Sequence, residues 1–383
     1  MKRLAYFVSH PIQYQAPLLR LLAAEPDLEI KVFFYSDFSV KGYLDPGFQQ
    51  LVEWDVPLTQ GYDHHFLQTW GAKQPTDTWR QAIALDIYAQ LKQGQFDAVW
   101  VHGWSQICSL QAILAANRLD LPVLMRGESN GLNSRQGWKS LLKAQFFKWL
   151  LPRIAKFLYI GTLNRQFYQT LGITSDRLYP VPYAVDNDFF FSLSQQAQTH
   201  RNQLRQSLNL QPNRPIILYA AKLVDWKRPQ DLIAAHRLLP EHPKPYLLFV
   251  GDGEMRTALE TLTSGDDSIR FLGFRNQSQM PAIYDLCDLF VLPSSFEPWG
   301  LAINEVMNAG KAVVVSDAVG CAPDLVKDQE NGKIFATGNI EQLQASLAWA
   351  IANSANAGAQ SHGIIRNWSF RTDIEGIRAS LAL

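Results

Sequence analysis

The chain has 383 residues, 47% of them hydrophobic and 18% charged, and its 35 Lys and Arg balance 35 Asp and Glu. A dedicated nucleic-acid-binding protein normally has a surplus of basic residues, so this balance argues against that class. The apolar content argues against a largely disordered chain. The three cysteines lie far apart, which excludes a disulfide framework or a Cys-rich zinc site and favours a reducing compartment.

The N-terminal apolar run, residues 4–8, stops at the sequence SHP of residues 9–11. A secretory signal needs about 7–15 apolar residues, and a membrane span needs about 18 or more. We therefore expect a cytoplasmic protein, at most peripheral at the inner face of a membrane.

Short β-rich apolar runs alternate with longer helical patterns along the chain, and this alternation predicts parallel sheets with crossover helices. The predicted strands are residues 4–8, 30–35, 98–102, 123–125, 157–160, 216–220, 246–250, 269–272, 289–292 and 312–315. The predicted helices include residues 15–24, 110–118, 229–239 and 340–351, whereas residues 353–358 and the pair His64-His65 are predicted to lie in loops.

The polar stretch 192–211 separates the two series of strands. We therefore predict an α/β protein with two Rossmann-like domains, residues 1–185 and 186–365, whose parallel sheets face a central cleft. A C-terminal segment, residues 366–383, follows them. Ligands of such sheets bind beyond the carboxyl ends of the strands, so the residues just after each strand are the candidates for function.

Two lysines, Lys222 and Lys227, follow a predicted strand and precede a helix that opens with Pro229. Two ammonium groups beside a helix N-terminus suit a diphosphate, although a solvated loop with surface lysines fits the same pattern. The glycines Gly251 and Gly253 follow another predicted strand but lack the third glycine of a dinucleotide fingerprint. They indicate a tight turn rather than a dinucleotide site.

Glu297 lies in the loop after a predicted strand, and Glu305 lies eight residues later on the following helix. A fully helical path would separate them by a rise of about 12 Å. A glycosidase carboxylate pair needs about 5–9.5 Å, so the spacing better suits two ends of one extended ligand. An exposed helix face is the alternative.

The sequence PSSFEPWGLAINE of residues 293–305, followed by AGKAVVVSD at 309–317 and NG at 331–332, resembles the signature of retaining GT-B glycosyltransferases of family GT4. The two lysines, VGDG at 250–253, FLGF at 271–274 and VPYAVD at 181–186 also resemble motifs of that family. The resemblance covers about residues 180–340 well and the N-terminal half loosely. It implies transfer of a sugar from a nucleotide-diphosphate sugar to a hydroxyl acceptor, such as a polysaccharide, a glycolipid or a small glycoside.

The resemblance also implies roles for single residues. Glu297 would bind hydroxyls of the donor sugar together with backbone amides at 299–301, Glu305 would bind the ribose, and Lys227 would neutralise the diphosphate. Lys222 stands where the family usually has Arg, so a point charge replaces a bidentate fork. The implied donor-binding residues are Lys222, Lys227, Phe274, Arg275, Glu297, Trp299, Gly300, Leu301 and Glu305. No metal and no cofactor is expected, because protein cations stabilise the leaving diphosphate.

The N-terminal half departs from the family pattern. Relatives often have a Gly-Gly loop after the first strand, whereas residues 9–14 read SHPIQY, and where many relatives carry a His this chain has Glu128. With Glu297 and Lys227, Glu128 completes the predicted catalytic set, unless it only forms a structural pair with Arg126. The further cleft candidates are His10, Gln13, His102 and Arg126.

Other functions on the same fold remain open: a non-catalytic sugar-nucleotide-binding protein, a nucleotide-sugar epimerase, and a phosphorylase, which the absence of an obvious lysine for pyridoxal phosphate disfavours. The motif containing both glutamates disfavours the epimerase, and the presence of Glu297, Glu305 and Lys227 gives no sign of lost activity.

The charge is unevenly distributed. Residues 1–185 carry 18 Lys and Arg against 14 Asp and Glu, and no acid occurs between Ser129 and Ser175, where seven bases fall. Trp138, Phe146 and Trp149 recur at helical spacing within residues 135–156. We predict that this segment makes weak contact with anionic membranes, with the core face of an ordinary helix as the alternative. By resemblance, residues 372–383 form a helix that packs back on the N-terminal domain.

Overall fold

The computed structural model describes residues 1–71, 83–132, 138–241 and 243–382. The chain divides into two compact units. The first consists of Met1–Tyr43, Val56–Tyr183 and Phe370–Leu383, and the second of Leu44–Asp55 and Ala184–Ser369. This division differs from the predicted one because residues 44–55, expected in the N-terminal domain, belong to the second unit.

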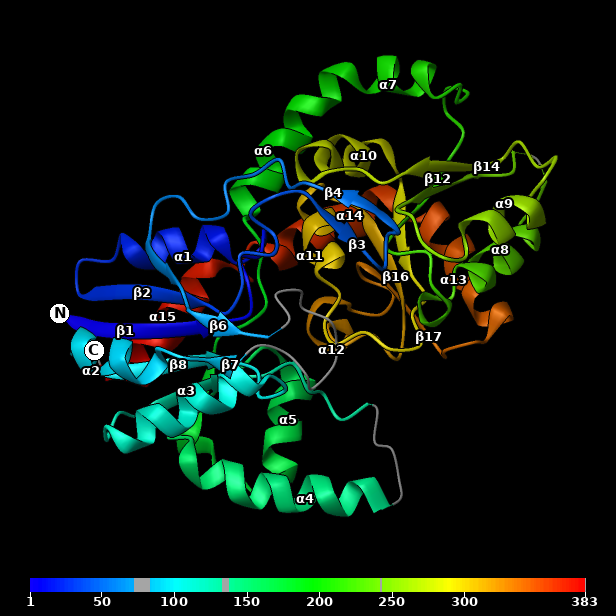
Figure 1. Ribbon diagram of the computed structural model, residues 1–383. Helices are drawn as coiled ribbons and strands as arrows, with labels where there is room; N and C mark the ends of the chain where they lie inside the picture. The colour runs from blue at the N-terminus through cyan, green and yellow to red at the C-terminus, as the bar shows by residue number, and fades with distance from the viewer. Residues whose placement is uncertain (72–82, 133–137, 242, 383) are drawn as a thin grey trace. The chain divides into compact units, whose positions relative to one another are not determined.

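The first unit is built on a sheet that has seven parallel strands in the described part of the chain, in the order β11-β10-β9-β8-β1-β2-β5. Figure 1 shows β2, β1 and β8 of this sheet next to one another. Its strand β1, which lies between β8 and β2, is apolar and buried from Leu4 to Val8, as expected where helices cover both faces of a parallel sheet. The strands are β1 Lys2–Val8, β2 Leu28–Phe34, β5 Asp63–Phe66, β8 Ala98–His102, β9 Val123–Arg126, β10 Lys156–Tyr159 and β11 Leu178–Pro180.

The helices of the first unit are α1 Ala16–Ala23, α2 Ile87–Gly94, α3 Ile107–Arg118, α4 Trp138–Leu150, α5 Thr162–Thr170 and α15 Phe370–Leu381. A short antiparallel pair, β6 Thr69–Trp70 and β7 Ile83–Ala84, lies beside α3. The core includes Phe147 and Leu150 of α4, which pack with side chains from the sheet and from α3. In the described ranges, no helix combines the length and the apolar character needed to cross a bilayer.

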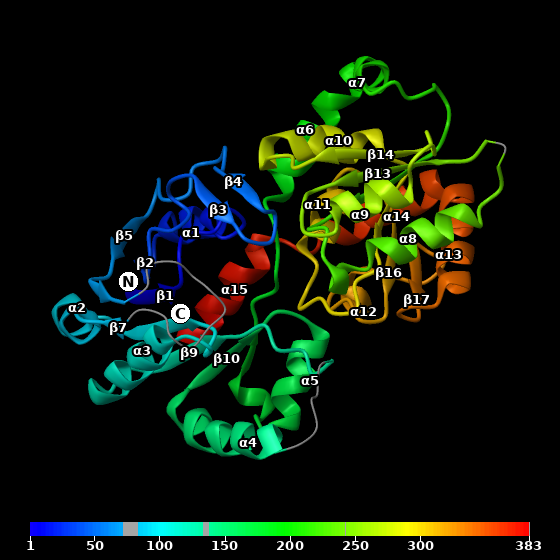
Figure 2. The ribbon, with the colours of Figure 1, turned by 45° about the vertical axis from the view of Figure 1, so that its right-hand side comes forward.

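The C-terminal helix α15, drawn in red in Figure 2, packs on β10 and β11 of the first sheet. A Cβ added at Gly376 would lie 1.8 Å from the Pro180 carbonyl oxygen, so only glycine permits this approach. Asp373 of α15 is fully buried and accepts a hydrogen bond from Arg126 of β9 at 3.1 Å. The helix is therefore an integral part of the first unit.

The second unit is also Rossmann-like. In the residues described, its sheet has six parallel strands in the order β14-β13-β12-β15-β16-β17. These are β12 Ile216–Ala220, β13 Tyr246–Val250, β14 Ile269–Gly273, β15 Leu289–Leu292, β16 Ala312–Ser316 and β17 Gly332–Phe335. The helices are α6 Asn187–Ala197, α7 Arg201–Ser207, α8 Pro229–Arg237, α9 Arg256–Leu262, α10 Met280–Leu286, α11 Leu301–Asn308, α12 Ala322–Leu325, α13 Ile340–Ala352 and α14 Ser354–Ile365. The hairpin β3 Tyr43–Asp45 and β4 Gln50–Val52 carries most of the segment 44–55.

Two local predictions are wrong. Residues 353–358 do not form a loop, because they open helix α14, where Gly358 packs so closely on Gly310 that an added Cβ would lie 2.1 Å from its carbonyl oxygen. The small residues in this stretch, whose composition is typical of a loop, therefore allow α14 to pack closely on the backbone at Gly310. His64 and His65 lie on the edge strand β5, and His65 Nε2 is 3.1 Å from Asp86 Oδ2.

Candidate active site

The loop between β15 and α11 carries Glu297 and is fixed to the segment that follows β16. The Glu297 N–H donates to the Ala318 carbonyl at 3.1 Å, and the Glu297 carbonyl accepts from the Gly320 N–H at 3.0 Å. A Cβ added at Gly320 would lie 1.9 Å from the Pro298 carbonyl oxygen. Gly320 therefore allows the two loops to touch, a role that the sequence reasoning missed because a lone glycine after a strand gives no distinctive signal.

Lys227 meets Glu297 in an ion pair, and both side chains are about five-sixths buried, with 16% and 15% of their surface exposed. Lys227 ends the short 3-10 helix Asp225–Lys227 just before α8. The Ser295 N–H donates to the Trp226 carbonyl at 2.7 Å, so backbone contacts hold the two loops together. Two of the three predicted catalytic residues thus lie side by side in the second unit.

Glu305 lies on α11 and accepts a hydrogen bond from the Tyr284 hydroxyl of α10 at 2.5 Å. Burial raises the pKa of Glu305 to about 7, although the Tyr284 hydroxyl acts in the opposite direction. This carboxyl therefore changes charge near neutral pH. Tyr284 was not predicted, because no sequence pattern links it to Glu305.

Trp299, Gly300 and Leu301 form the entry to α11. Trp299 is buried, its indole N–H donates to Asn304 Oδ1 at 2.9 Å, and its ring stacks on Trp368 with centroids 5.3 Å apart. Gly300 has a φ of 103°, in the region that favours glycine. The Trp299 side chain thus anchors the loop, whereas its predicted role concerns only the backbone amide.

Lys222, at the end of β12, is bound by the segment 44–55. Its ammonium group lies 2.9 Å from Asp45 Oδ1 and 4.8 Å from the centroid of the Phe48 ring. Burial alone would raise the pKa of Asp45, but hydrogen bonds from Lys222 and from the N–H groups of Phe48 and Gly47 lower it below its usual value. Asp45 is therefore a carboxylate at neutral pH.

The same segment packs on Phe274. The ring of Phe274 lies 5.0 Å from that of Phe48 and 6.3 Å from that of Trp54, in edge-to-face geometry, and Arg275 follows it in a partly exposed position. The neighbouring Asn276 Nδ2 donates to the Glu53 carbonyl at 2.5 Å. Residues from early in the chain thus surround the place predicted for the nucleotide base.

Gly251 and Gly253 serve close packing. A Cβ at Gly251 would lie 2.1 Å from the Ala221 carbonyl oxygen, and one at Gly253 would lie 2.6 Å from that of Leu223. The two glycines allow the loop after β13 to lie against the loop that carries Lys222. This agrees with the tight-turn interpretation.

A second polar cluster lies in the first unit, where β1, β8 and β9 end. His102 Nδ1 is 3.0 Å from the Tyr6 hydroxyl, and His102 Nε2 is 3.0 Å from the Tyr183 hydroxyl. Tyr183 in turn donates a hydrogen bond to Glu128, whose Oε1 is 3.6 Å from His102 Nε2. Two predicted residues, His102 and Glu128, therefore lie together. Tyr183, which joins them, belongs to the motif at 181–186 but was not predicted as a site residue.

Burial acts to raise the pKa of Glu128, but His102, Tyr183 and Arg126 together lower it below its ordinary value. The alternative prediction, a structural pair between Arg126 and Glu128, is wrong, because the Arg126 side chain is only 2% exposed and pairs with Asp373. Arg126 is therefore a buried structural residue rather than the predicted cleft residue, although its charge still acts on Glu128.

His10 and Gln13 lie between β1 and α1. His10 Nδ1 is 2.9 Å from the Ser9 hydroxyl, and burial, with a smaller effect of His102, lowers the pKa of His10 to about 4. His10 is therefore neutral at pH 7. Gln13 is partly exposed in the same turn.

The described residues contain no group of three or more His, Cys, Asp or Glu arranged to hold a metal ion. In the second unit, the cations nearest Glu297 and Asp45 are the ammonium groups of Lys227 and Lys222.

Comparison with known proteins finds similar sequences for part of the chain and similar folds for all of it. Residues 200–366 match the family model Glycosyl transferases group 1. The crystal structure of Anabaena Alr3699/HepE in complex with UDP superposes with a TM-score of 0.75 and 18% identity, covering all of both chains. The chain has the GT-B fold.

Two curated relatives match the chain in part. The uncharacterized glycosyltransferase MJ1607 of Methanocaldococcus jannaschii is 31% identical over 170 residues, which are 44% of this chain and 40% of that protein. The N,N'-diacetylbacillosaminyl-diphospho-undecaprenol alpha-1,3-N-acetylgalactosaminyltransferase of Campylobacter jejuni is 25% identical over 197 residues, 50% of each chain. The chain thus spans half or less of the length of these relatives.

Proposed function

We propose that this protein is a retaining glycosyltransferase of the GT4 type that moves a sugar from a nucleotide-diphosphate donor to a hydroxyl acceptor. The observation that carries the proposal is the ion pair between Lys227 and Glu297 within the matched domain. A cation for the diphosphate and a carboxylate for the sugar must be neighbours, because the bond to be broken joins the sugar to the diphosphate. The Anabaena structure holds UDP, which supports a donor of this class.

In the donor site, Lys227 stabilises the charge that develops on the leaving diphosphate, and Glu297 accepts hydrogen bonds from sugar hydroxyls. Glu305 binds the ribose hydroxyls, and the backbone around Phe274 and Arg275 meets the base. Lys222 gives a second positive charge for the diphosphate. The acceptor attacks the face that the leaving group departs from, and a diphosphate oxygen takes the acceptor proton.

On the acceptor side, Glu128 of the first unit orients the acceptor hydroxyl by accepting its hydrogen bond before the attack. As the bond to the sugar forms, this hydroxyl turns its proton to the diphosphate oxygen, and Glu128 remains ionised. Its lowered pKa keeps it ionised at neutral pH, and Tyr183 and His102 hold its orientation. No metal takes part in this proposal, because the two lysines supply the positive charge that a divalent ion gives in other transferases.

The proposal is tested by Glu297→Gln and Lys227→Ala. We expect Glu297→Gln to lose turnover because a neutral amide orients the sugar poorly, and Lys227→Ala to lose donor binding as well. Removing one partner of a buried charge pair costs about 2–5 kcal/mol, or about 30-fold to several thousand-fold in kcat/KM. The matched controls are the exposed residues of the same unit, Glu330→Gln and Lys327→Ala.

The donor is identified first by thermal shift against a panel of nucleoside diphosphates and their sugars, since ligand at 100 times its dissociation constant adds about 2.7 kcal/mol of stability. Slow donor hydrolysis without acceptor then separates a transferase from a protein that only binds sugar nucleotides. Wild-type kcat/KM in either site variant would contradict the site assignment.

We also propose that the protein is cytoplasmic and that residues 135–156 contact anionic membranes weakly. Arg135 and the side chains of residues 138–141 lie outside what the structure describes. In the rest of α4, Leu142 is 61% exposed and Trp149 is 37% exposed, whereas Leu150 is buried. Exposed apolar residues among lysines suit an anionic surface. Equal recovery in the supernatant after sedimentation with neutral and anionic liposomes, at low and high salt, would contradict this contact.

A further inference from the structure

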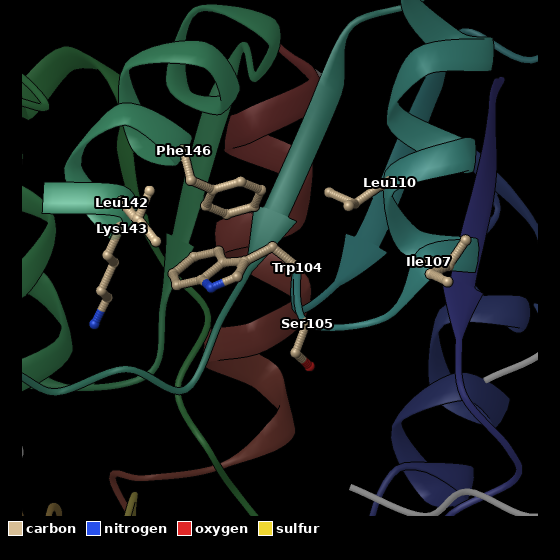
Figure 3. A pocket seen from close by; sticks show the side chains of 7 residues that line it. All are labelled: Trp104, Ser105, Ile107, Leu110, Leu142, Lys143 and Phe146. Carbon is tan, nitrogen blue, oxygen red and sulfur yellow. The ribbon is translucent and has the colours of Figure 1, made fainter. Parts of the chain in front are cut away.

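A pocket of about 530 Å³ opens in the first unit between α3, α4 and the loop after β8. Figure 3 shows the side chains that line it. Five of them are apolar or aromatic, and they come from the loop and from both helices: Trp104, Ile107, Leu110, Leu142 and Phe146. Ser105 and Lys143 complete the lining. The volume falls in the range of about 300–1,000 Å³ that small-molecule sites occupy.

The one charged side chain among the described residues of the lining is a cation, Lys143. Lys143, which extends away from the Phe146 ring in Figure 3, lies within the stretch from Ser129 to Ser175 that contains no acid. Its ammonium group is 5.7 Å from the centroid of the Phe147 ring and 5.7 Å from that of Phe167. An anionic group beside the pocket would thus meet a cation and no carboxylate from this stretch.

The pocket adjoins the polar cluster around Glu128. Trp104 comes two residues after His102 in the same loop. A Cβ added at Gly127 would lie 2.8 Å from Cζ3 of the Trp104 ring, so the backbone next to Glu128 packs directly on a pocket wall. The Gly127 N–H also donates to the Tyr168 hydroxyl at 2.9 Å. Trp104 is therefore shared between the lining of the pocket and the packing of the backbone beside Glu128.

We propose that this pocket binds the hydrocarbon chain of an anionic amphiphile, and that this amphiphile is the acceptor. The chain lies among Trp104, Leu110 and Phe146, the anionic group faces Lys143, and the hydroxyl to be glycosylated is held at Glu128. The acceptor role rests on the proposed transferase function, whereas the binding of the amphiphile stands on the pocket alone.

The test titrates dodecyl phosphate, below the concentration at which it forms micelles, into the full-length protein by calorimetry. We expect one molecule to bind saturably. The Kd should increase about fourfold for each methylene removed from the part of the hydrocarbon chain inside the pocket. Leu110→Trp fills the pocket and should reduce the affinity at least tenfold. The matched control is Leu114→Trp, because Leu114 lies on the same helix, is 45% exposed and does not line the pocket.

Lys143→Gln tests the contribution of the anionic group to binding separately from that of the hydrocarbon chain. This variant should bind dodecyl phosphate more weakly than the wild type. Its affinity for dodecyl maltoside, a neutral amphiphile of the same chain length, should be unchanged. No saturable binding by the wild type, or equal affinity in Leu110→Trp with its melting temperature retained, would overturn the proposal. UDP titration of the same variants reports on the second unit, so a failure of the donor proposal is recognised separately.

An independent observation concerns the donor site. The carboxylate of Asp45 forms an ion pair with Lys222, one of the two cations assigned to the diphosphate. Asp45 is itself largely buried. Asp45 lies 177 residues before Lys222, and its segment 44–55 is outside the residues matched by the family model.

We infer that Asp45 sets the affinity for the donor by competing with the diphosphate for Lys222. The inference rests on the proposed function. A diphosphate that approaches Lys222 must displace Asp45 or share the cation with it, and two anions at one cation repel each other. Asp45 thereby weakens donor binding and favours release of the nucleoside diphosphate product.

Asp45→Asn is the informative variant, because the remaining side-chain oxygen can still accept from the N–H groups of Gly47 and Phe48. We expect this variant to bind UDP about twofold to fivefold more tightly than the wild type, as calorimetry would show. In a Lys222→Met background the same change should leave the Kd unaltered. Asp55→Asn, on the same segment but bound to Ser278, is the matched control and should not change it.

A purely structural role predicts the opposite sign, because a loosened segment would weaken UDP binding. Equal or weaker binding by Asp45→Asn would therefore overturn the inference. If instead Lys222→Met alone leaves UDP affinity unchanged, the assignment of Lys222 to the diphosphate fails.

Discussion

The charge of Glu305 should control nucleotide affinity near neutral pH. Burial raises the pKa of this carboxyl to about 7, and its proposed partners are the two ribose hydroxyls, which are hydrogen-bond donors. An ionised carboxylate accepts both hydrogen bonds, whereas the protonated acid must give up one acceptor position. Because the ionised form is the better partner, affinity should rise as pH rises through 7.

The magnitude follows from the pKa. With a value of about 7, about nine-tenths of Glu305 is ionised at pH 8 and about one-tenth at pH 6. If only the ionised form binds the ribose well, the Kd should increase about tenfold from pH 8 to pH 6, which corresponds to about 1.4 kcal/mol. Tyr284→Phe should shift the profile to higher pH, because the Tyr284 hydroxyl acts to lower the pKa of Glu305.

The assay is calorimetric titration with the nucleotide-sugar rather than UDP. The terminal phosphate of UDP has its own pKa near 6, so its ionisation would add a second pH dependence to the Kd. Glu305→Gln should bind more weakly at pH 8 and show a flat profile. The exposed Glu330→Gln should keep the wild-type slope. A wild-type Kd that changes less than twofold between pH 6 and pH 8 would refute the reasoning.

Three further predictions concern the backbone, the core and metal dependence. Gly320→Ala should reduce UDP affinity at least tenfold with an unchanged far-UV circular dichroism spectrum, because its Cβ would lie 1.9 Å from the Pro298 carbonyl oxygen, whereas Gly363→Ala, with open space around it, should have no effect. Asp373→Asn should cost about 3–5 kcal/mol in urea unfolding because it leaves Arg126 buried without its counter-ion, and Arg126→Met should recover most of that loss in the double variant. Turnover should survive EDTA, and loss of activity on chelation that Mg²⁺ or Mn²⁺ restores would contradict the role given to the lysines.

The sequence predicts the strands of this fold well, because a parallel strand buried on both faces is a continuous apolar run. Residues 312–315 illustrate this, and the strand found is β16 Ala312–Ser316. The pattern fails where small or polar residues carry the packing. Helix α14 was missed because its Ala and Gly residues resemble a loop, and β5 was missed because two histidines lie on an edge strand.

The site was predictable where neighbours in sequence are neighbours in space. Glu297, Gly300 and Leu301 share one loop and the start of one helix, so their motif places them together. Contacts across long separations leave no periodic signal. Asp45 and Lys222 are 177 residues apart, and nothing in either local pattern indicates that they meet. For the same reason, the tyrosine partners of Glu128 and Glu305 came only from the structure.

The buried pair of Arg126 and Asp373 has a consequence for biosynthesis. The two residues are 247 positions apart, and translation at about 5–20 residues per second delivers Asp373 about 12–50 s after Arg126. During that interval Arg126 of β9 lacks its partner Asp373 on α15, while residues 184–369 of the second unit are being synthesised. The unit that is begun first is thus completed only after the second unit has been synthesised, because α15 supplies its last contacts.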